Sequence, residues 1–393
     1  MKKRIAIIGK GTAGSQSIIH YLRYMQDCEI HWYFDESIPT QAVGEGSVLN
    51  LPVNLFYNLN FSYLDLDKID ATLKVGIYKS GWGRTGKPFL HDFPPPSVGL
   101  HFNAVALQNF IYEKIKDRVV IHNKNTNASD IDADYIMDCS GKPSSYEEFN
   151  KSSFIPVNSA YITQCYWEYP RFQYSLTIAR PYGWVFGIPL KNRCSIGYLF
   201  NRNIDNIDAI KEDVKAIFEE YDLIPSDNTN YLEFENYYRK KNYTDRVVYN
   251  GNKSFFLEPL ESTSIVLINR IQRIAFDLWN NAQTPQTLDN LNLNYIRTVS
   301  EIETMIMLHY FAGSVYDTEF WKFANEQGKK CIETAVKYDS KFIDIIKYVV
   351  ETKHSNLCDS KLPDYGSWWT GSFCQNLQGL GIESILQDYL KAL

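Results

Sequence analysis

The sequence predicts an α/β fold in three parts: a dinucleotide-binding module, an antiparallel sheet, and a mostly helical C-terminal part. Three observations support this fold class. A short apolar strand runs into a G-x-G-x-x-G turn that opens a helix. Four runs rich in aromatic and β-branched residues follow in mid-chain. From about residue 291 onward the apolar residues recur with helical spacing.

The first strand, Arg4–Ile8, leads into Gly9-Lys10-Gly11-Thr12-Ala13-Gly14. In such a turn the first glycine permits a sharp bend and the second lets backbone amides approach a pyrophosphate. The third glycine lets the following helix pack on the strand, and the helix N-terminus favours the phosphate charge. We therefore expect Gly9, Gly11, Thr12, Ala13 and Gly14 to bind a dinucleotide.

Two later strands add to this prediction. The strand Ile30–Phe34 ends at Asp35 and Glu36, whose carboxylates are spaced to accept from ribose hydroxyls. A late strand within residues 134–141 ends in a small-residue turn that contains Asp138, Ser140 and Gly141. Such a returning strand suits the second contact of a flavin, although Ser-Gly after a strand is often only a turn. The motif by itself does not separate NAD from FAD, and an unrelated glycine-rich turn is the alternative.

Composition excludes several function classes. The net charge is −6 and the pI about 5.7 without basic blocks, so nucleic acid and anionic membranes are poor partners. The seven cysteines form no CxxC pair, which is typical of reduced thiols in the cytoplasm. No apolar run reaches the roughly 18 residues of a membrane span. The histidines lack HxxxH spacing, so we assign no metal.

Four segments behind the glycine turn resemble the flavin-dependent halogenases of the tryptophan halogenase type. They are Val43–Ser47 (VGEGS), Ala71–Ile77 (ATLKVGI), Gly183–Leu190 (GWVFGIPL) and Phe256–Ile265 (FLEPLESTSI). Leu308–Tyr310, Asp317–Trp321 and Gln378–Gly381 also resemble the family's C-terminal half, so the likeness covers nearly the whole chain. The resemblance implies a glutathione-reductase-like FAD module formed by residues 1–150 with about 245–290. It also implies a sheet and substrate region at 151–244 and a helical substrate region at 291–393.

The resemblance gives Lys74 the role of the active-site lysine. Lys74 stands among apolar and small residues that alternate as in a strand. An isolated lysine in such a strand usually lies on a solvated face, but a family lysine at this position delivers halogen from hypohalous acid to an arene. We expect Lys79, five residues later, to be solvated and without a catalytic role.

The segment around Glu261 precedes a helix whose apolar stripe includes Ile265 and Ile271. Ser262, Thr263 and Ser264 are good N-cap residues, and capping alone would explain them. The free amides at a helix start also suit an anion. The resemblance assigns halide binding to Thr263 and Ser264 and a catalytic carboxylate to Glu261, whereas we expect Glu258 to be structural.

The remaining site residues also follow from the resemblance. It adds Gly44, Glu45, Gly46, Ser47 and Leu257 to the FAD set. For the substrate pocket it names Trp184, Phe186, Pro189, Trp368 and Trp369, although helix packing is the more common explanation for the last two. Two departures stand out: Phe186 occupies a family tryptophan position, and Ser264 replaces the usual glycine. The first departure predicts a wider passage between the flavin and the substrate. The second leaves the preferred halide undecided among chloride, bromide and iodide.

These expectations combine into one function. We expect FADH2- and O2-dependent halogenation of an electron-rich aromatic of the indole, phenol or pyrrole type. A separate NAD(P)H-dependent flavin reductase supplies the reduced FAD, halide is the co-substrate, and the protein is cytoplasmic. The sequence leaves undecided whether the protein forms a homo-oligomer. The alternatives are an FAD-dependent aromatic hydroxylase, which would ignore halide, and a catalytically degenerate flavin-binding protein.

Overall fold

The computed structural model describes residues 2–39, 45–94, 96–281, 283–352 and 364–391. The chain divides into two compact units. Unit 1 comprises Met1–Thr72, Gly99–Lys151 and Asn236–Arg297, and unit 2 comprises Leu73–Val98, Ser152–Glu235 and Thr298–Leu393. The units divide the chain at other points than the three predicted regions, because the strands between Leu73 and Val98 hydrogen-bond within the large sheet of unit 2.

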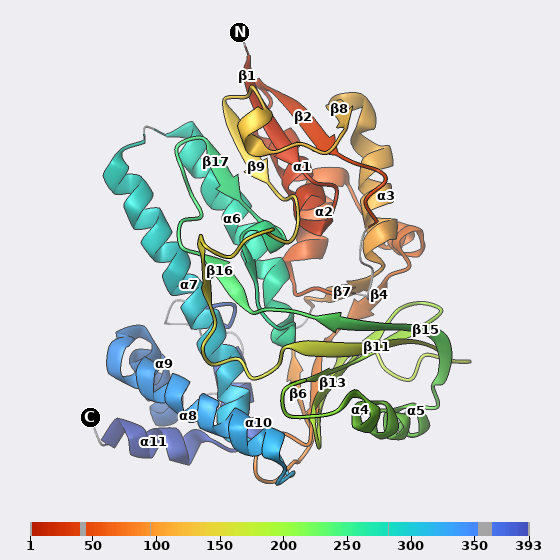
Figure 1. The fold of residues 1–393 in the computed structure, drawn as a ribbon, viewed down its shortest axis with the longest axis vertical. Coiled ribbons are helices and arrows are strands. Elements are labelled where there is room, and N and C mark those ends of the chain that lie inside the picture. Colours follow the sequence, from red (N-terminus) through yellow and green to blue (C-terminus); the bar gives the residue numbers. More distant parts are fainter. Residues whose placement is uncertain (1, 40–44, 95, 282, 353–363, 392–393) are drawn as a thin grey trace. The chain divides into compact units, whose positions relative to one another are not determined.

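A five-stranded sheet in the order β17-β9-β1-β2-β8 forms the centre of unit 1 (Figure 1). All four strand pairs are parallel. The strands are β1 (Lys3–Ile8), β2 (Cys28–Phe34), β8 (Val120–Asn123), β9 (Tyr135–Asp138) and β17 (Val247–Tyr249). Parallel strands buried on both faces are expected to be apolar, and the buried parts of β1 (IAII, after Lys3 and Arg4) and β9 (IM, before Asp138) are.

The helices of unit 1 are α1 (Thr12–Tyr24), α2 (Asn50–Leu59), α3 (Ala104–Ile115) and α6 (Thr263–Asn280), with the first part of α7 (Pro285–Ala312). Short 3-10 helices are η1 (Tyr63–Ile69), η2 (Lys116–Arg118), η3 (Ala128–Asp130), η4 (Gly251–Lys253) and η5 (Leu260–Ser262). In one small sheet β3 (Glu45–Gly46) pairs with β7 (Gly99–Phe102). In the other, β16 (Tyr237–Arg239) lies between β10 (Phe149–Lys151) and β18 (Phe255–Phe256). The chain passes from unit 1 to unit 2 inside β4 (Thr72–Lys74).

Unit 2 is built on a seven-stranded sheet in the order β15-β11-β14-β13-β12-β5-β6. Its strands are β5 (Gly76–Ser80), β6 (Phe89–Asp92), β11 (Ser159–Tyr166), β12 (Ser175–Arg180), β13 (Gly183–Pro189), β14 (Cys194–Phe200) and β15 (Ile224–Glu233). Every pair is antiparallel except β5 with β12. The four mid-chain strands and their antiparallel pairing confirm the sequence prediction.

The helices of unit 2 are α4 (Ile207–Asp213), α5 (Lys215–Glu220), α8 (Glu319–Tyr338), α9 (Ser340–Thr352), α10 (Thr370–Leu380) and α11 (Glu383–Lys391). The sequence predicts one amphipathic helix over 207–221, but the structure has α4 and α5, which meet at Val214. The prediction of a mostly helical C-terminal part is confirmed. Among the described residues, no helix has the length and apolar character required to cross a bilayer.

Candidate active site

The predicted dinucleotide residues meet at one edge of the unit 1 sheet. In the order β9-β1-β2, Ile8 pairs with Asp138 on one side and with Tyr33 on the other. Gly9, Cys139 and Phe34 therefore follow at the carboxyl ends of three adjacent parallel strands. Ligands of open α/β sheets bind at this edge. The structure thus brings the glycine turn, Asp35 and the Asp138–Gly141 turn together within unit 1.

The space around the three glycines fits a dinucleotide. Gly9 has φ +99°, and a Cβ there would lie 2.3 Å from the Cys139 carbonyl oxygen. A Cβ on Gly14 would lie 2.0 Å from the Gly9 oxygen, so α1 approaches β1 more closely than any side chain allows. At Gly11, the N-cap of α1, a Cβ would meet no atom within 4 Å. Gly9 and Gly14 are thus required by the protein's own packing, whereas Gly11 leaves space where a pyrophosphate would approach.

The carboxylates after β2 are already ordered by neighbouring groups. Asp35 Oδ1 accepts from Ser37 N at 2.9 Å and Ser37 Oγ at 2.6 Å, which lowers the Asp35 pKa below its ordinary value. The backbone N–H of Glu36 donates to Asn123 Oδ1, and Asn123 Nδ2 donates to Glu36 Oε2. Asp35 is therefore ionised at neutral pH, as an acceptor for ribose hydroxyls must be.

The turn after β9 is fixed by Asp138. Its side chain is buried and its Oδ1 accepts from Ser140 N at 3.0 Å. Gly141 has φ +92°, and a Cβ there would meet no atom within 4 Å. Ser140 is exposed beside it. Asp138 therefore stabilises the turn, and the positions with space for a ligand are at Ser140 and Gly141.

A second segment that the sequence analysis predicts to bind FAD follows β2 in the chain. Gly44 lies outside the described residues. Glu45 and Gly46 form β3, and Ser47 is buried, with its Oγ accepting from Leu100 N at 2.9 Å. Asn50, at the start of α2, donates to the Ile265 carbonyl in the first turn of α6. This segment therefore lies beside the predicted halide segment within unit 1.

The start of α6 has unusual backbone geometry. Glu261 and Ser262 both have positive φ, 68° and 55°, although neither is glycine. Two consecutive non-glycine residues in this region store strain, which persists only where the surroundings enforce it. Ser262 is the N-cap but makes no side-chain capping bond to the helix, so the predicted capping by this hydroxyl is absent. Glu261 and Thr263 are buried, as are Leu257 and Glu258, while Ser264 is partly buried.

Lys74, the last residue of β4, belongs to unit 2 and is fully buried. Its Nζ lies 5.6 Å from the centroid of the Phe93 ring. The predicted alternation is interrupted here, because Val75 separates β4 from β5 and is exposed while Lys74 and Gly76 are buried. Lys74 therefore does not lie on a solvated strand face, which was the alternative interpretation of this residue.

The expectation that Lys79 is solvated is wrong. Lys79 is also fully buried, and its Nζ lies 2.7 Å from His309 Nε2 and donates to Asn376 Oδ1. The rings of Phe89 and Trp368 each lie 5.6 Å from the ammonium. His309 Nδ1 lies 3.1 Å from the Met305 carbonyl oxygen, which makes Nδ1 the protonated nitrogen and leaves Nε2 to accept from Lys79. We call Lys79, His309 and Asn376 the lysine cluster.

The predicted substrate-pocket residues belong to unit 2 and are mostly buried. Trp184 donates from Nε1 to Tyr310 OH at 3.0 Å, and the Phe186 ring lies where a Cβ on Gly197 would be. Trp368 packs against the rings of His309 at 5.7 Å and His91 at 6.0 Å. Pro189 is buried, and Trp369 is partly buried. Except for Trp369, these side chains therefore act mainly in packing in this conformation.

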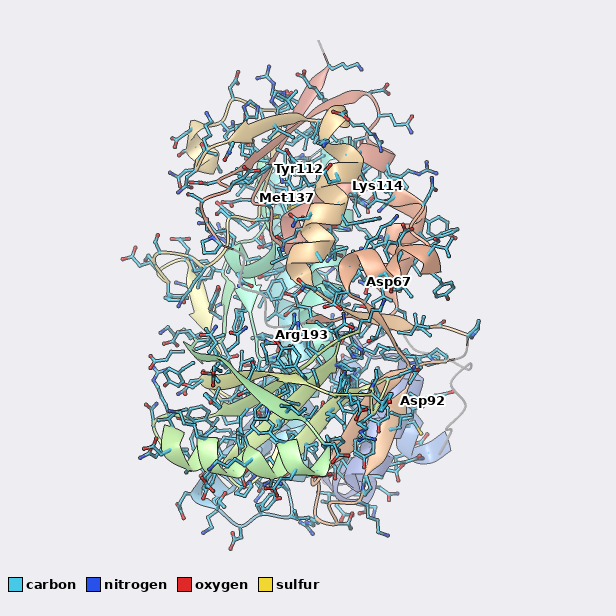
Figure 2. The ribbon with its side chains drawn as sticks, turned by 90° about the vertical axis from the view of Figure 1, so that its right-hand side faces the viewer. Asp67, Asp92, Tyr112, Lys114, Met137 and Arg193 are labelled. Carbon is cyan, nitrogen blue, oxygen red and sulfur yellow. The ribbon has the colours of Figure 1, made fainter. Side chains whose placement is uncertain are left out.

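Sequence reasoning missed two basic residues. One is Lys79, whose partners are 230 and 297 residues away in sequence. The other is Lys10, between the first two glycines, whose Nζ lies 4.5 Å from the ring of Tyr112 and 5.2 Å from that of Phe34. Tyr112 lies on α3, where it is labelled together with Lys114 (Figure 2). A basic residue inside a turn that is predicted to bind phosphate was the available sequence signal for Lys10.

The predicted site residues are divided between the units. Unit 1 carries the FAD set, Glu261, Thr263 and Ser264, and unit 2 carries Lys74 and the aromatic residues. Within the described ranges, no group of three His, Cys, Asp or Glu side chains has an arrangement that could hold a metal ion.

Comparison with known proteins gives consistent results. The sequence model described as tryptophan halogenase matches residues 4–129 and 116–349. Tryptophan 7-halogenase RebH of Lentzea aerocolonigenes is 25% identical over 258 residues, which are 58% of this chain and 47% of RebH. Tryptophan 6-halogenase ThaL of Streptomyces albogriseolus is 23% identical over 213 residues, 53% of this chain and 39% of ThaL. The chain thus covers less than half the length of either relative.

The fold is also shared with a solved structure. A flavin-dependent halogenase from Xanthomonas campestris superposes with a TM-score of 0.80 at 17% identity, covering 100% of this chain and 94% of that one. At this level of identity the likeness shows the fold. It confirms the predicted α/β class with its helical C-terminal part.

Proposed function

Since the chain belongs to the tryptophan halogenase family, we propose that it is a flavin-dependent halogenase acting on an electron-rich aromatic ring. The observation that carries this proposal is the burial of Lys74. A lysine at the family's catalytic position is held out of bulk water, against the face of Phe93. An exposed lysine would lose hypohalous acid to solvent and to competing nucleophiles, whereas a buried one restricts its reaction to a bound substrate.

Unit 1 supplies the cofactor site in this proposal. The glycine turn, Asp35 and the turn at Ser140 and Gly141 would hold FAD, with Gly11 leaving room for the pyrophosphate. Lys10 adds a positive charge to the same turn. Bound as FADH2, the cofactor supplies the two electrons with which O2 and a halide ion become hypohalous acid and water. A separate NAD(P)H-dependent flavin reductase would keep it reduced.

The amides at the start of α6 would bind the halide. This 18-residue helix presents its N-terminal N–H groups and the positive end of its dipole at Thr263 and Ser264. The left-handed conformation of Glu261 and Ser262 fixes the direction in which the chain enters the helix. We propose that the strained segment orients these amides, and that chloride, bromide or iodide occupies them.

Lys74 would then transfer the halogen. Its amine hydrogen-bonds the oxygen of hypohalous acid, or exchanges a proton for the halogen and carries it as a haloamine. On the first route the ring attacks the halogen with its π electrons, and the oxygen of hypohalous acid leaves as water after protonation. On the second route that oxygen leaves as water when the haloamine forms, and the ring then displaces the amine nitrogen from the halogen, so the amine is restored by protonation. A carboxylate takes the displaced ring proton, and we assign that step to Glu261. Aromaticity is restored when the proton leaves, so atoms and charge balance.

The proposal is tested with the purified chain, FAD, a flavin reductase and NADH. We expect chloride, bromide or iodide to yield halogenated products from a panel of indoles, phenols and pyrroles, measured by mass spectrometry. Lys74→Ala should lose these products while FADH2 oxidation continues. Hydroxylated products formed without halide would instead identify an aromatic hydroxylase. FAD binding with neither product would identify a degenerate flavoprotein.

A further inference from the structure

A cavity of about 710 Å³ lies in unit 1 at the end of the sheet where its strands begin. Its lining comes from the amino ends of β1, β2 and β8, the last turn of α1 and η2. The chain begins beside this end of the sheet (Figure 1). Because β1, β2 and β8 are parallel, the predicted dinucleotide residues lie at the opposite edge. We call this space the amino-end cavity.

Part of the amino-end cavity is apolar and sized for an organic molecule. Met25 and Ile30 are buried, Leu22 and Val119 are half-buried, and Val120 lies beside them in the lining. Pockets for small ligands usually measure about 300–1,000 Å³ and are lined mainly by such side chains. The cavity therefore has both the volume and the apolar wall that a small organic ligand requires.

The rest of the lining is charged. It contains three basic and two acidic side chains, namely Lys2, Arg4, Arg118, Glu29 and Asp117. Glu29 Oε2 lies 3.1 Å from His31 Nε2 and 3.8 Å from Arg4 Nε, so its charge is partly compensated. Within the part of the chain that the structure describes, Lys2 and Arg118 form no ion pair. The lining thus has an excess of one positive charge at neutral pH, although the whole chain is acidic.

Arg4 presents a buried donor at the cavity. Its Nη1 donates to the Asp132 carbonyl oxygen at 2.8 Å, which holds the guanidinium in place. Its Nε is buried and makes no hydrogen bond to any described residue. Leaving a buried N–H without an acceptor is unfavourable, so an acceptor inside the cavity would be stabilised there. A hydrogen bond from a guanidinium to a carboxylate is among the strong ones.

The charge balance favours a monoanion. A neutral ligand would leave the excess positive charge without a partner, whereas a dianion would be repelled by Glu29 and Asp117. The end of α1 adds little negative potential, because its carbonyls are already engaged. Tyr21 O accepts from Met25 N at 2.9 Å, and Met25 O accepts from Cys28 N at 3.1 Å. The sign of the site is therefore set by the charged side chains.

We propose that the amino-end cavity binds a small organic monocarboxylate. The carboxylate accepts from Arg4 Nε beside Lys2 and Arg118, and the apolar body of the ligand lies against the wall formed by α1, β2 and β8. This binding site is separate from the predicted cofactor edge, and it does not depend on the halogenase assignment.

Cys28 provides a readout inside the cavity. It belongs to the lining and is partly exposed, whereas the other cysteines that the structure describes are buried. Burial raises the pKa of the Cys28 thiol, so its alkylation by iodoacetamide is followed at alkaline pH. Mass spectrometry of the peptide that contains Cys28 gives the rate. A ligand in the cavity covers the thiol and slows the reaction.

The probe is 2-naphthoate, which joins an apolar ring system to one carboxylate. We expect calorimetry on the full chain to show binding with the same Kd in the presence and absence of FAD. Saturating 2-naphthoate should slow the alkylation of Cys28 several-fold. 2-Naphthamide has the same rings without the charge and should bind roughly tenfold more weakly. Equal binding of the amide, displacement by FAD or an unchanged alkylation rate would overturn the proposal. Tighter binding of the dianion 2-naphthyl phosphate would overturn the choice of a monocarboxylate.

A pair of substitutions tests the cations. Lys2→Gln with Arg118→Gln removes two positive charges from the lining and should weaken 2-naphthoate binding roughly tenfold. Arg23→Gln is the matched control, because Arg23 is exposed in the last turn of α1 but does not line the cavity. An unchanged Kd in the double variant would contradict the proposal. Circular dichroism shows whether the variants are folded. Should the double variant misfold, the comparison of 2-naphthoate with 2-naphthamide on the wild type decides.

Discussion

Lys74 and Lys79 are five residues apart in sequence, lie in the same unit and are equally buried, yet their amines have different surroundings. Lys79 donates within the lysine cluster to a histidine nitrogen, His309 Nε2, at 2.7 Å and to an amide oxygen, Asn376 Oδ1. Lys74 ends a strand that breaks at Val75, and its amine lies against one aromatic face. Burial alone therefore does not identify a reactive lysine. The two lysines differ in their place on the backbone, because Lys74 ends β4 whereas Lys79 lies inside β5 and contacts His309 and Asn376.

The largest expected effect separates the two lysines by activity. Lys74→Met keeps the length and the apolar stem of the side chain but removes the amine. We expect the halogenation rate to fall by about 10²–10⁴-fold, the usual contribution of a positioned acid–base group. Initial rates of halogenated product against those of the wild type measure this loss. FAD affinity is the control. An equal loss of FAD binding would show that the substitution disturbs the fold and that the lost activity does not come from the missing amine.

Lys79→Met should act on stability. The variant leaves His309 Nε2 and Asn376 Oδ1 buried without this donor, and each such loss costs about 1–3 kcal/mol. We expect the free energy of unfolding to fall by about 2–4 kcal/mol, measured by urea denaturation. Lys322→Met on α8 is the matched control, since its side chain is 56% exposed in the same unit. A wild-type midpoint for Lys79→Met would show that the lysine cluster contributes no stability.

His20 of unit 1 extends the comparison to a buried basic group without such acceptors. Its Nε2 has no hydrogen-bond partner among the described residues, and burial together with the Arg273 charge lowers the His20 pKa to about 4. The folded state therefore resists protonation. The contribution of His20 is complete above its ordinary pKa of 6.5 and is lost as the pH falls through 4.

In the wild type, the free energy of unfolding should fall between pH 6.5 and 4 because of His20. We expect His20→Leu to remove on the order of 2–3 kcal/mol of this fall. Urea midpoints at several pH values in this window, for wild type and variant, measure the change. Parallel curves for the two proteins would show that His20 is protonated equally in the folded and unfolded states.

The smallest effect concerns the charge on Lys79. Asn376→Asp replaces the amide oxygen by a carboxylate of the same shape and gives the ammonium a charged acceptor, although it removes the Asn376 donation to Ser372 O. We expect a gain of about 1 kcal/mol at neutral pH. An ammonium lowers a carboxyl pKa, so the gain is present above about pH 4 and is lost at lower pH. Equal stabilisation at pH 3 and 7 would contradict an ion pair.

The sequence analysis succeeded where the structural signal is local. The strand, glycine turn and helix around Gly9–Gly14, the four mid-chain strands and the apolar stripe of α6 follow from spacing within a few residues. It failed at Lys79, because His309 and Asn376 come from α7 and α10, which no local pattern brings to β5. It also missed β15, whose ten residues are largely polar and exposed and lack the alternation of a buried strand.

The site was predictable for the same reason only in part. The proposed cofactor turn was predicted from glycine spacing, and the proposed role of Lys74 from its match to a family segment. The strain at Glu261 and Ser262 could not, since neither is a residue that normally adopts positive φ. Tertiary structure enforces that conformation, and the periodicity of the sequence does not predict it.

The central claim is that Lys74 delivers hypohalous acid and does not generate it. The most direct test traps the free acid with an external 1,3-diketone during turnover of Lys74→Met with FAD, reductase and bromide. We predict that the scavenger is brominated in proportion to the O2 consumed while the aromatic substrate stays unmodified. Halogenation of that substrate at the wild-type level would contradict the account.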